Sequence, residues 1–229
     1  METKKSAFNV FRDALQQGIY KVINPFVRLL IKIGFTPNMV STVGLFGNLC
    51  AAALFAVAGF KAMDDGGMHW TTIWVAGIVI IASSLFDMLD GQVARLGNMV
   101  SRFGAFYDSV LDRYCEMITL GGIAFYLICI NAPAWALVTF LALVGSVMVS
   151  YTRARAEGLD VECKVGFMQR PERVVVTSLC AIAAGITGES GADEAAVLII
   201  GLAMALIAAL ANLTAFVRIA HTKAAIEDK

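Results

Sequence analysis

Six long apolar runs divide this chain of 229 residues. They cover residues 39–60, 70–96, 103–130, 134–158, 170–186 and 195–218. Each is near the length of about 20 residues that a helix needs to cross a bilayer. None shows the strict alternation of apolar and polar residues that is typical of a barrel strand. We therefore expect an all-α integral membrane protein with six transmembrane helices.

The composition agrees with a membrane setting. Hydrophobic residues make up 59% of the chain, charged residues only 16%, and the mean hydropathy is +0.74. Soluble domains of this size are less apolar and more highly charged. The formal net charge is zero, and we expect no nucleic-acid partner.

Local signals divide the chain into two parts at residue 36. Residues 1–36 mix apolar and charged side chains at helical spacing, which predicts an amphipathic helix lying along the membrane surface. Residues 37–229 form the expected six-helix membrane domain. Thr36 before Pro37 is a typical helix cap followed by a first-turn proline, and Pro133 and Pro171 also stand where new helices should begin.

The basic residues predict the orientation, because short cytoplasmic segments accumulate lysine and arginine. They gather before the first span, around the second and fourth connections, and after the last span, whereas only Lys61 falls on the other side. We expect a multi-pass protein of the cell (inner) membrane with both termini and the active site, at the aspartates of residues 87–112, on the cytoplasmic side.

One acidic motif stands out where the second and third apolar runs meet. Its spacing is D-x2-D-G-x2-A-R-x8-G-x3-D-x3-D, and its residues are Asp87, Asp90, Gly91, Ala94, Arg95, Gly104, Asp108 and Asp112. Helical geometry places Asp87, Asp90, Gly91 and Ala94 on one narrow stripe and Gly104, Asp108 and Asp112 on a second, and the two stripes together can form an acidic cage with Arg95 beside it. Carboxylates beside hydrocarbon are costly unless a counter-charge is present. Hard oxygen donors suit Mg²⁺ or Mn²⁺, and a pair of such ions is the usual apparatus for displacement at phosphorus.

Two other interpretations of the acids remain open at this point. The carboxylates could touch water at helix ends and pair with Arg95, Arg102 and Arg113. Alternatively, intramembrane acids could belong to a cation or proton transporter. A transporter would distribute polar groups along a path to the far side, yet the distal parts of these runs contain no charged residue. A purely structural scaffold has no use for so many desolvated carboxylates.

The complete motif resembles that of the CDP-alcohol phosphotransferase family, membrane enzymes of phospholipid synthesis. The resemblance implies transfer of a phosphate-linked group from a CDP-alcohol to a second alcohol, with release of CMP. It also implies that the protein is a homodimer. It further implies a role for each motif residue. Asp87, Asp90, Asp108 and Asp112 would hold the metals, Asp112 would also be the base, and Gly91, Ala94, Arg95 and Gly104 would line the nucleotide. Glu116 continues the stripe and is interpreted as a supporting residue or a partner of Arg113.

Four arginines flank the fourth connection and point to the acceptor. They are Arg153, Arg155, Arg170 and Arg173. Guanidinium groups suit a phosphate, although membrane anchoring and pairing with Glu157 and Glu172 is the simpler explanation. The segments SYTRARAE and GFMQRPER resemble the pattern of prokaryotic phosphatidylinositol phosphate synthases and their archaeal counterparts. The resemblance favours CDP-diacylglycerol as donor and inositol phosphate as acceptor, with glycerol 3-phosphate as the main rival. Serine or another neutral alcohol would leave the arginines less well explained.

Overall fold

The computed structural model describes residues 23–227, and every regular element in that range is a helix. A short helix over residues 23–32 leads into six long helices. These are α2 (Pro37–Asp65), α3 (Trp70–Leu96), α4 (Arg102–Cys129), α5 (Pro133–Glu157), α6 (Arg170–Glu189) and α7 (Asp193–Glu227). The all-α expectation is confirmed for this range. Most of the amphipathic helix expected within residues 1–36 lies outside the described residues.

The helix boundaries follow the local sequence signals. The Thr36 hydroxyl accepts a hydrogen bond from the Met39 N–H at 3.3 Å, and Pro37 lies in the first turn of α2. Prolines also lie in the first turns of α5 and α6, where the missing N–H has no partner to lose. Gly158 follows the last residue of α5. The six apolar runs therefore correspond closely to six helices.

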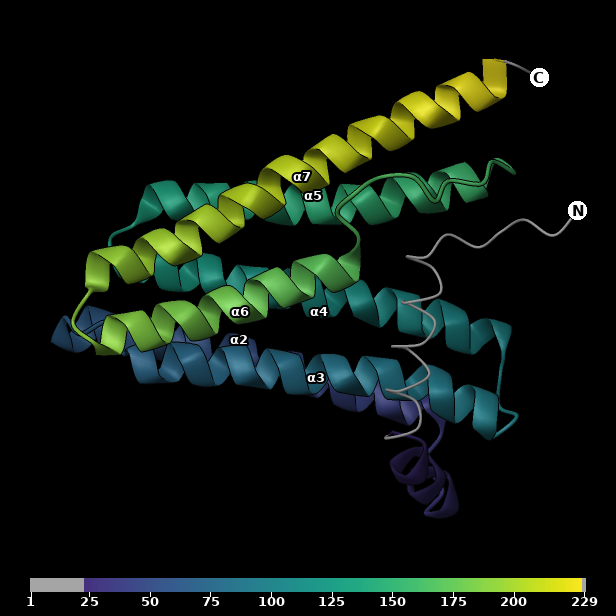
Figure 1. Cartoon of the computed structure of the whole chain (residues 1–229), viewed down its shortest axis with the longest axis horizontal. Coiled ribbons are helices and arrows are strands. Elements are labelled where there is room, and N and C mark those ends of the chain that lie inside the picture. Colours follow the sequence, from purple (N-terminus) through teal and green to yellow (C-terminus); the bar gives the residue numbers. More distant parts are fainter. Residues whose placement is uncertain (1–22, 228–229) are drawn as a thin grey trace, which may run out of the picture.

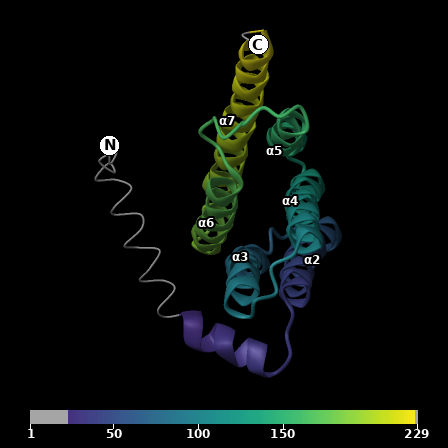
Figure 2. The same ribbon diagram turned by 90° about the vertical axis from the view of Figure 1, so that its right-hand side faces the viewer.

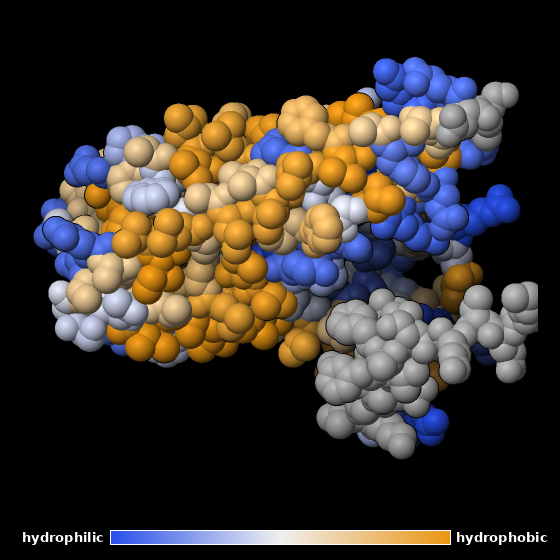
Figure 3. Space-filling model, turned by 45° about the horizontal axis from the view of Figure 1, so that its top comes forward, coloured by the Kyte–Doolittle hydropathy of each residue, from blue (hydrophilic) through white to orange (hydrophobic). Residues whose placement is uncertain are grey.

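Four of these helices are long and apolar enough to cross a membrane, namely α2, α3, α5 and α7. The other two, α4 and α6, are 28 and 20 residues long, and charged side chains shorten the apolar part of each. Most of those charges lie in the N-terminal half of each helix, as in the first turn of α6. Apolar side chains also predominate in the middle of the face that Figure 3 shows, with hydrophilic residues toward its two ends. This chain is a membrane protein.

The six long helices form a closed ring. The main helix pairings run from α2 to α3, α6, α7, α5 and α4, and α4 packs back on α2. The view along the bundle shows this order, with the helix over residues 23–32 crossing beneath α2 and α3 (Figure 2). Small residues allow close approach between helices. A Cβ at Gly77 of α3, for example, would lie only 2.8 Å from the Ser178 carbonyl of α6.

The two ends of the ring differ in their connections. Residues 97–101 and 158–169 connect helices at one end, which we call the site end (Figure 1). The opposite end carries the three short connections at residues 66–69, 130–132 and 190–192. Since α3 ends and α4 begins at the site end, the two halves of the acidic motif are brought together there.

Candidate active site

Asp90 and Asp108 form the first part of the candidate site. Asp90 lies near the end of α3 and is only 6% exposed. Its Oδ2 accepts a hydrogen bond of 2.5 Å from the Ser41 hydroxyl of α2. The Asp108 carboxyl of α4 is an electrostatic neighbour of Asp90, and both residues line the same cavity. Three helices thus meet at this pair of carboxyl groups.

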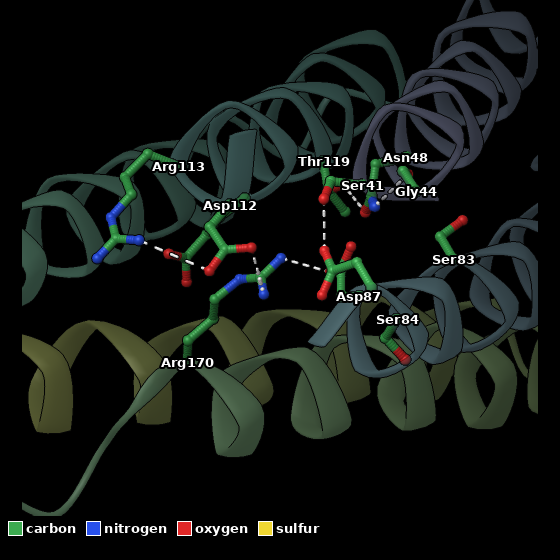
Figure 4. A network of polar contacts seen from close by, with 12 residues as sticks. Ser41, Gly44, Asn48, Ser83, Ser84, Asp87, Asp112, Arg113, Thr119 and Arg170 are labelled. Carbon is green, nitrogen blue, oxygen red and sulfur yellow. Dashed lines mark hydrogen bonds and ion pairs between the residues drawn. The ribbon is translucent and has the colours of Figure 1, made fainter. Parts of the chain in front are cut away.

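Asp87 and Asp112 form the second part, and Arg170 lies between them (Figure 4). Nη2 of Arg170 is 2.7 Å from Oδ2 of Asp87, and its Nη1 is 2.7 Å from Oδ1 of Asp112. Arg113 is a weaker neighbour of Asp112, at 3.6 Å from Oδ2. A single guanidinium from α6 therefore joins a carboxylate of α3 to a carboxylate of α4.

The donor set fits a divalent metal by its chemistry. Four carboxyl groups on facing helices supply the hard oxygen ligands that Mg²⁺ and Mn²⁺ prefer, and the Arg170 guanidinium already shows that a cation is accommodated between two of them. Within residues 23–227, no three acidic, histidine or cysteine side chains converge closely enough to enclose an ion as they stand. The carboxylates would have to reorient to share one.

Helix α2 packs closely against the Asp87 side chain at Gly44. An added Cβ at Gly44 would lie 2.5 Å from Oδ1 of Asp87. The helix can approach this carboxylate only because Gly44 has no side chain.

A cavity of about 400 Å³ lies between the ends of α3 and α4, and we call it the α3–α4 cavity. Asp90 and Asp108 lie on its wall, together with Ser41 and Asn38. All four residues expected around the nucleotide line it as well, namely Gly91, Ala94, Arg95 and Gly104. The three small residues leave the cavity open, and Arg95 adds a positive charge to its wall.

A second cavity of about 410 Å³ lies between α4, α5, α6 and α7, and we call it the arginine pocket. Asp112 lies on its wall beside Arg113. Three of the four arginines expected at the acceptor line it, namely Arg153, Arg170 and Arg173. The space-filling view shows a hydrophilic hollow at the site end (Figure 3).

The fourth expected arginine, Arg155, is not brought to this pocket. Its side chain is exposed, and it is absent from the lining residues. Arg153, two positions earlier on α5, does line the pocket and also pairs with Glu157, with Nε 2.8 Å from Oε1. Residues two apart on a helix point in different directions, so only one of this pair can face inward.

Glu116 has a different partner from the one considered on sequence alone. It forms a two-fold ion pair with Arg173 of α6, in which Nη2 donates to Oε2 at 2.9 Å and Nε donates to Oε1. Arg113 instead donates to the Ser109 carbonyl of its own helix at 2.6 Å. Glu116 therefore links α4 to α6.

Sequence reasoning missed three residues that shape the site. Ser41 and Gly44 lie on α2, outside the acidic motif, and nothing in their spacing connects them with it. Arg218 of α7 also lines the arginine pocket and is only 3% exposed. On sequence it counts merely as a basic residue near the chain's end, although a long cationic side chain that interrupts an apolar helix is itself a signal of a polar partner.

Comparison with known proteins agrees with this geometry. The family model described as CDP-alcohol phosphatidyltransferase matches residues 35–222. A phosphatidylinositol phosphate synthase of Cutibacterium acnes is 34% identical over 171 residues, covering 74% of this chain and 76% of the relative. An archaetidylinositol phosphate synthase of Pyrococcus horikoshii is 33% identical over 166 residues, covering 71% of this chain and 79% of the relative.

Solved structures share the fold. The crystal structure of Mycobacterium tuberculosis phosphatidylinositol phosphate synthase with CDP-DAG bound superposes with a TM-score of 0.74 at 25% identity. That match covers 88% of this chain and 94% of the other. The same mycobacterial protein in complex with manganese and citrate superposes with a TM-score of 0.72 at 27% identity, covering 86% of this chain and 87% of the other.

The fold and the site define a membrane-embedded enzyme that transfers a substituted phosphate group with the help of a divalent metal. The family match extends over most of the chain and includes both cavities, helices α2 to α6 and α7 as far as residue 222. The chain belongs to the CDP-alcohol phosphatidyltransferase family. This membership supports the enzymatic interpretation of the acids over a transporter or a scaffold.

Proposed function

We propose that this enzyme transfers the phosphatidyl group of CDP-diacylglycerol to inositol 1-phosphate and forms phosphatidylinositol phosphate and CMP. One observation carries the proposal. Asp112 lies on the wall of the arginine pocket, whereas Asp108, one turn earlier on α4, lies on the wall of the α3–α4 cavity. The reacting groups of a nucleotide donor and a phosphorylated acceptor could therefore meet at these carboxylates.

The donor is assigned to the α3–α4 cavity. Gly91, Ala94 and Gly104 leave room for the flat nucleotide, and Arg95 offers a cation for a phosphate oxygen. The crystal structure of the mycobacterial relative with CDP-DAG bound supports this class of donor. The diacylglycerol chains would remain in the bilayer while the CDP group enters the cavity.

The acceptor is assigned to the arginine pocket. Arg153, Arg170, Arg173 and Arg218 line it and make it positively charged, which suits a phosphate on a soluble alcohol. Arg155 is removed from this set because its side chain is exposed and lies outside the lining. Relatives named for inositol phosphate products support inositol 1-phosphate, and glycerol 3-phosphate remains the rival acceptor.

The proposed reaction is a single displacement at the phosphorus that bears the diacylglycerol. The acceptor hydroxyl oxygen forms a new bond to this phosphorus, and the bond from the phosphorus to the CMP oxygen breaks. Asp112 receives the hydroxyl proton. Asp87, Asp90, Asp108 and Asp112 would hold two Mg²⁺ or Mn²⁺ ions. When bound, the ions neutralise charge on the pyrophosphate and on the leaving CMP.

The same proposal includes the membrane arrangement. All six long helices would span the bilayer, as one domain over residues 37–229 with an interfacial segment at 1–36. The site end carries most of the lysines and arginines, whereas Asp64, Asp65, Glu189, Asp193 and Glu194 lie at the opposite end. We infer that the site end faces the cytoplasm of a cell whose inner membrane holds the enzyme as a homodimer.

CMP release tests the proposal. Purified protein receives CDP-diacylglycerol and Mg²⁺ with inositol 1-phosphate, glycerol 3-phosphate, free inositol or serine in separate reactions. Release with inositol 1-phosphate alone is expected. Release with glycerol 3-phosphate alone would keep the mechanism and overturn the acceptor, and release with none of the four would overturn the function.

A further inference from the structure

The peptide groups of Met168 are held from two sides just before α6 begins. The Met168 N–H donates to the Thr214 hydroxyl of α7 at 3.3 Å. The Met168 carbonyl accepts a hydrogen bond of 2.9 Å from Nη1 of Arg173. Met168 is itself only 4% exposed. A loop residue is thus fixed at both its donor and its acceptor.

All three nitrogens of Arg173 take part in these contacts. Its Nε and Nη2 donate to the two carboxylate oxygens of Glu116, and its Nη1 donates to Met168. The side chain is 2% exposed, and that of Glu116 is 8% exposed. Three of the five N–H donors of Arg173 are therefore used within the protein, and the burial of its side chain restricts access of a phosphate to the other two.

The loop before α6 also packs closely against Thr214 of α7. Thr214 is 1% exposed, and its hydroxyl also donates to the Leu210 carbonyl at 2.7 Å. Gly166 packs against the Thr214 side chain, where an added Cβ would clash with Cγ2. The φ of Gly166 is +109°, a conformation that favours glycine. The loop therefore follows the surface of α7 closely.

We propose that Glu116, Arg173 and Thr214 form a clamp on Met168 that positions Arg170 for the acceptor. The clamp draws on α4, α6 and α7 and lies two residues before Arg170. Arg170 lines the arginine pocket and contacts Asp112. In this account Arg173 and Glu116 are positioning residues, and Arg173 does not bind the acceptor phosphate. The proposal rests on the proposed acceptor pocket.

Glu116→Gln separates this role from direct phosphate binding. The substitution removes the negative charge that faces Arg173. It leaves Arg173 itself unchanged and keeps nearly the same side-chain volume at position 116. If Arg173 bound the acceptor phosphate, its release from Glu116 would lower the KM for inositol 1-phosphate or leave it unchanged. The clamp predicts a higher KM for inositol 1-phosphate, because the loop before Arg170 is then held less firmly.

The expected result is a rise of about tenfold in that KM for Glu116→Gln and for Arg173→Gln, with the KM for CDP-diacylglycerol unchanged. The double variant should be no worse than the more impaired single variant, because both substitutions break one unit. A lowered or unchanged KM in Glu116→Gln, or fully additive effects, would overturn the clamp.

Thr214→Val provides a milder test if the charged pair is needed for folding. It keeps the shape of the side chain and removes the acceptor of the Met168 N–H, whereas Thr214→Ser keeps the hydroxyl and is the matched control. Hydrogen exchange of the segment around Met168, measured in nanodiscs, should be faster in Thr214→Val and normal in Thr214→Ser. Unchanged exchange in Thr214→Val would contradict the clamp. This readout needs no turnover, so it stays informative if inositol 1-phosphate is not the acceptor.

Discussion

Nη1 of Arg170 lies 2.7 Å from Oδ1 of Asp112, and this contact joins the arginine pocket to the acidic motif. The same guanidinium reaches Asp87 at 2.7 Å through Nη2. A side chain proposed to bind the acceptor is therefore in direct contact with the proposed base. The arrangement places an acceptor phosphate and its reacting hydroxyl within one connected set of charges.

Asp112→Asn should abolish turnover while the protein still folds. The amide keeps the size of the carboxyl group but cannot accept the hydroxyl proton, and loss of a general base lowers kcat by about 10²–10⁴. CMP release under saturating substrates measures the effect. Asp64→Asn, an exposed position at the opposite end of the ring, is the control. Undiminished activity in Asp112→Asn would remove this residue as base.

Arg153→Ala and Arg155→Ala should differ, although both remove an arginine from the same turn of α5. Arg153 lines the arginine pocket and Arg155 does not. Loss of a charge-assisted hydrogen bond to the acceptor phosphate costs about 1.5–3 kcal/mol. The KM for inositol 1-phosphate should therefore rise about tenfold or more in Arg153→Ala and stay near the wild-type value in Arg155→Ala. Equal effects of the two substitutions would contradict the placement of the pocket.

Gly44→Ala should inactivate the enzyme through Asp87. The added Cβ would lie 2.5 Å from Oδ1 of this carboxylate, whereas a Cβ at Gly121 of α4 meets nothing within 4 Å. Gly121→Ala is thus a matched control for a glycine-to-alanine change in a long helix. We expect a loss of kcat of at least about tenfold in Gly44→Ala. Equal activity of both variants would show that Asp87 can move without consequence.

Ser41→Ala should weaken metal binding. The Ser41 hydroxyl donates to Asp90 at 2.5 Å and orients a proposed ligand, and removal of such an outer partner lowers metal affinity by about 10–100-fold. Mn²⁺ titration followed by electron paramagnetic resonance measures this without turnover. Ser190→Ala, at the opposite end, should bind Mn²⁺ as the wild type does. An unchanged affinity in Ser41→Ala would separate Asp90 from the metal site.

Much of the fold could be predicted from the sequence because its signals are local. The apolar run Trp70–Leu96 coincides with α3, and Thr36–Pro37, Pro133 and Pro171 mark helix starts. The ring order of the helices could not be predicted in this way. It depends on packing between helices, such as the contact of Gly77 with α6, and no local pattern specifies the partner.

The candidate site could likewise be predicted only where its signals are local. The regular spacing of the motif predicts that Asp90 and Asp108 share a region with the small residues, since both stripes follow from helical geometry. The bridge from Arg170 to Asp87 joins residues 83 positions apart, and the pairing of Glu116 with Arg173 spans 57. Such long-range pairings depend on the position and rotation of α6 in the ring. Packing between helices also decides which face of α5 points inward, and so why Arg153 lines the pocket and Arg155 does not.

The mass of the lipid product tests the central claim most directly. Wild-type enzyme and Asp112→Asn would be supplied with CDP-diacylglycerol, Mg²⁺ and inositol 1-phosphate carrying an ¹⁸O-labelled phosphate. We predict a wild-type lipid that holds the inositol and the intact labelled phosphate, formed in equal amount with CMP and absent in Asp112→Asn. A lipid without the labelled phosphate, or equal product from the variant, would contradict the proposed transfer.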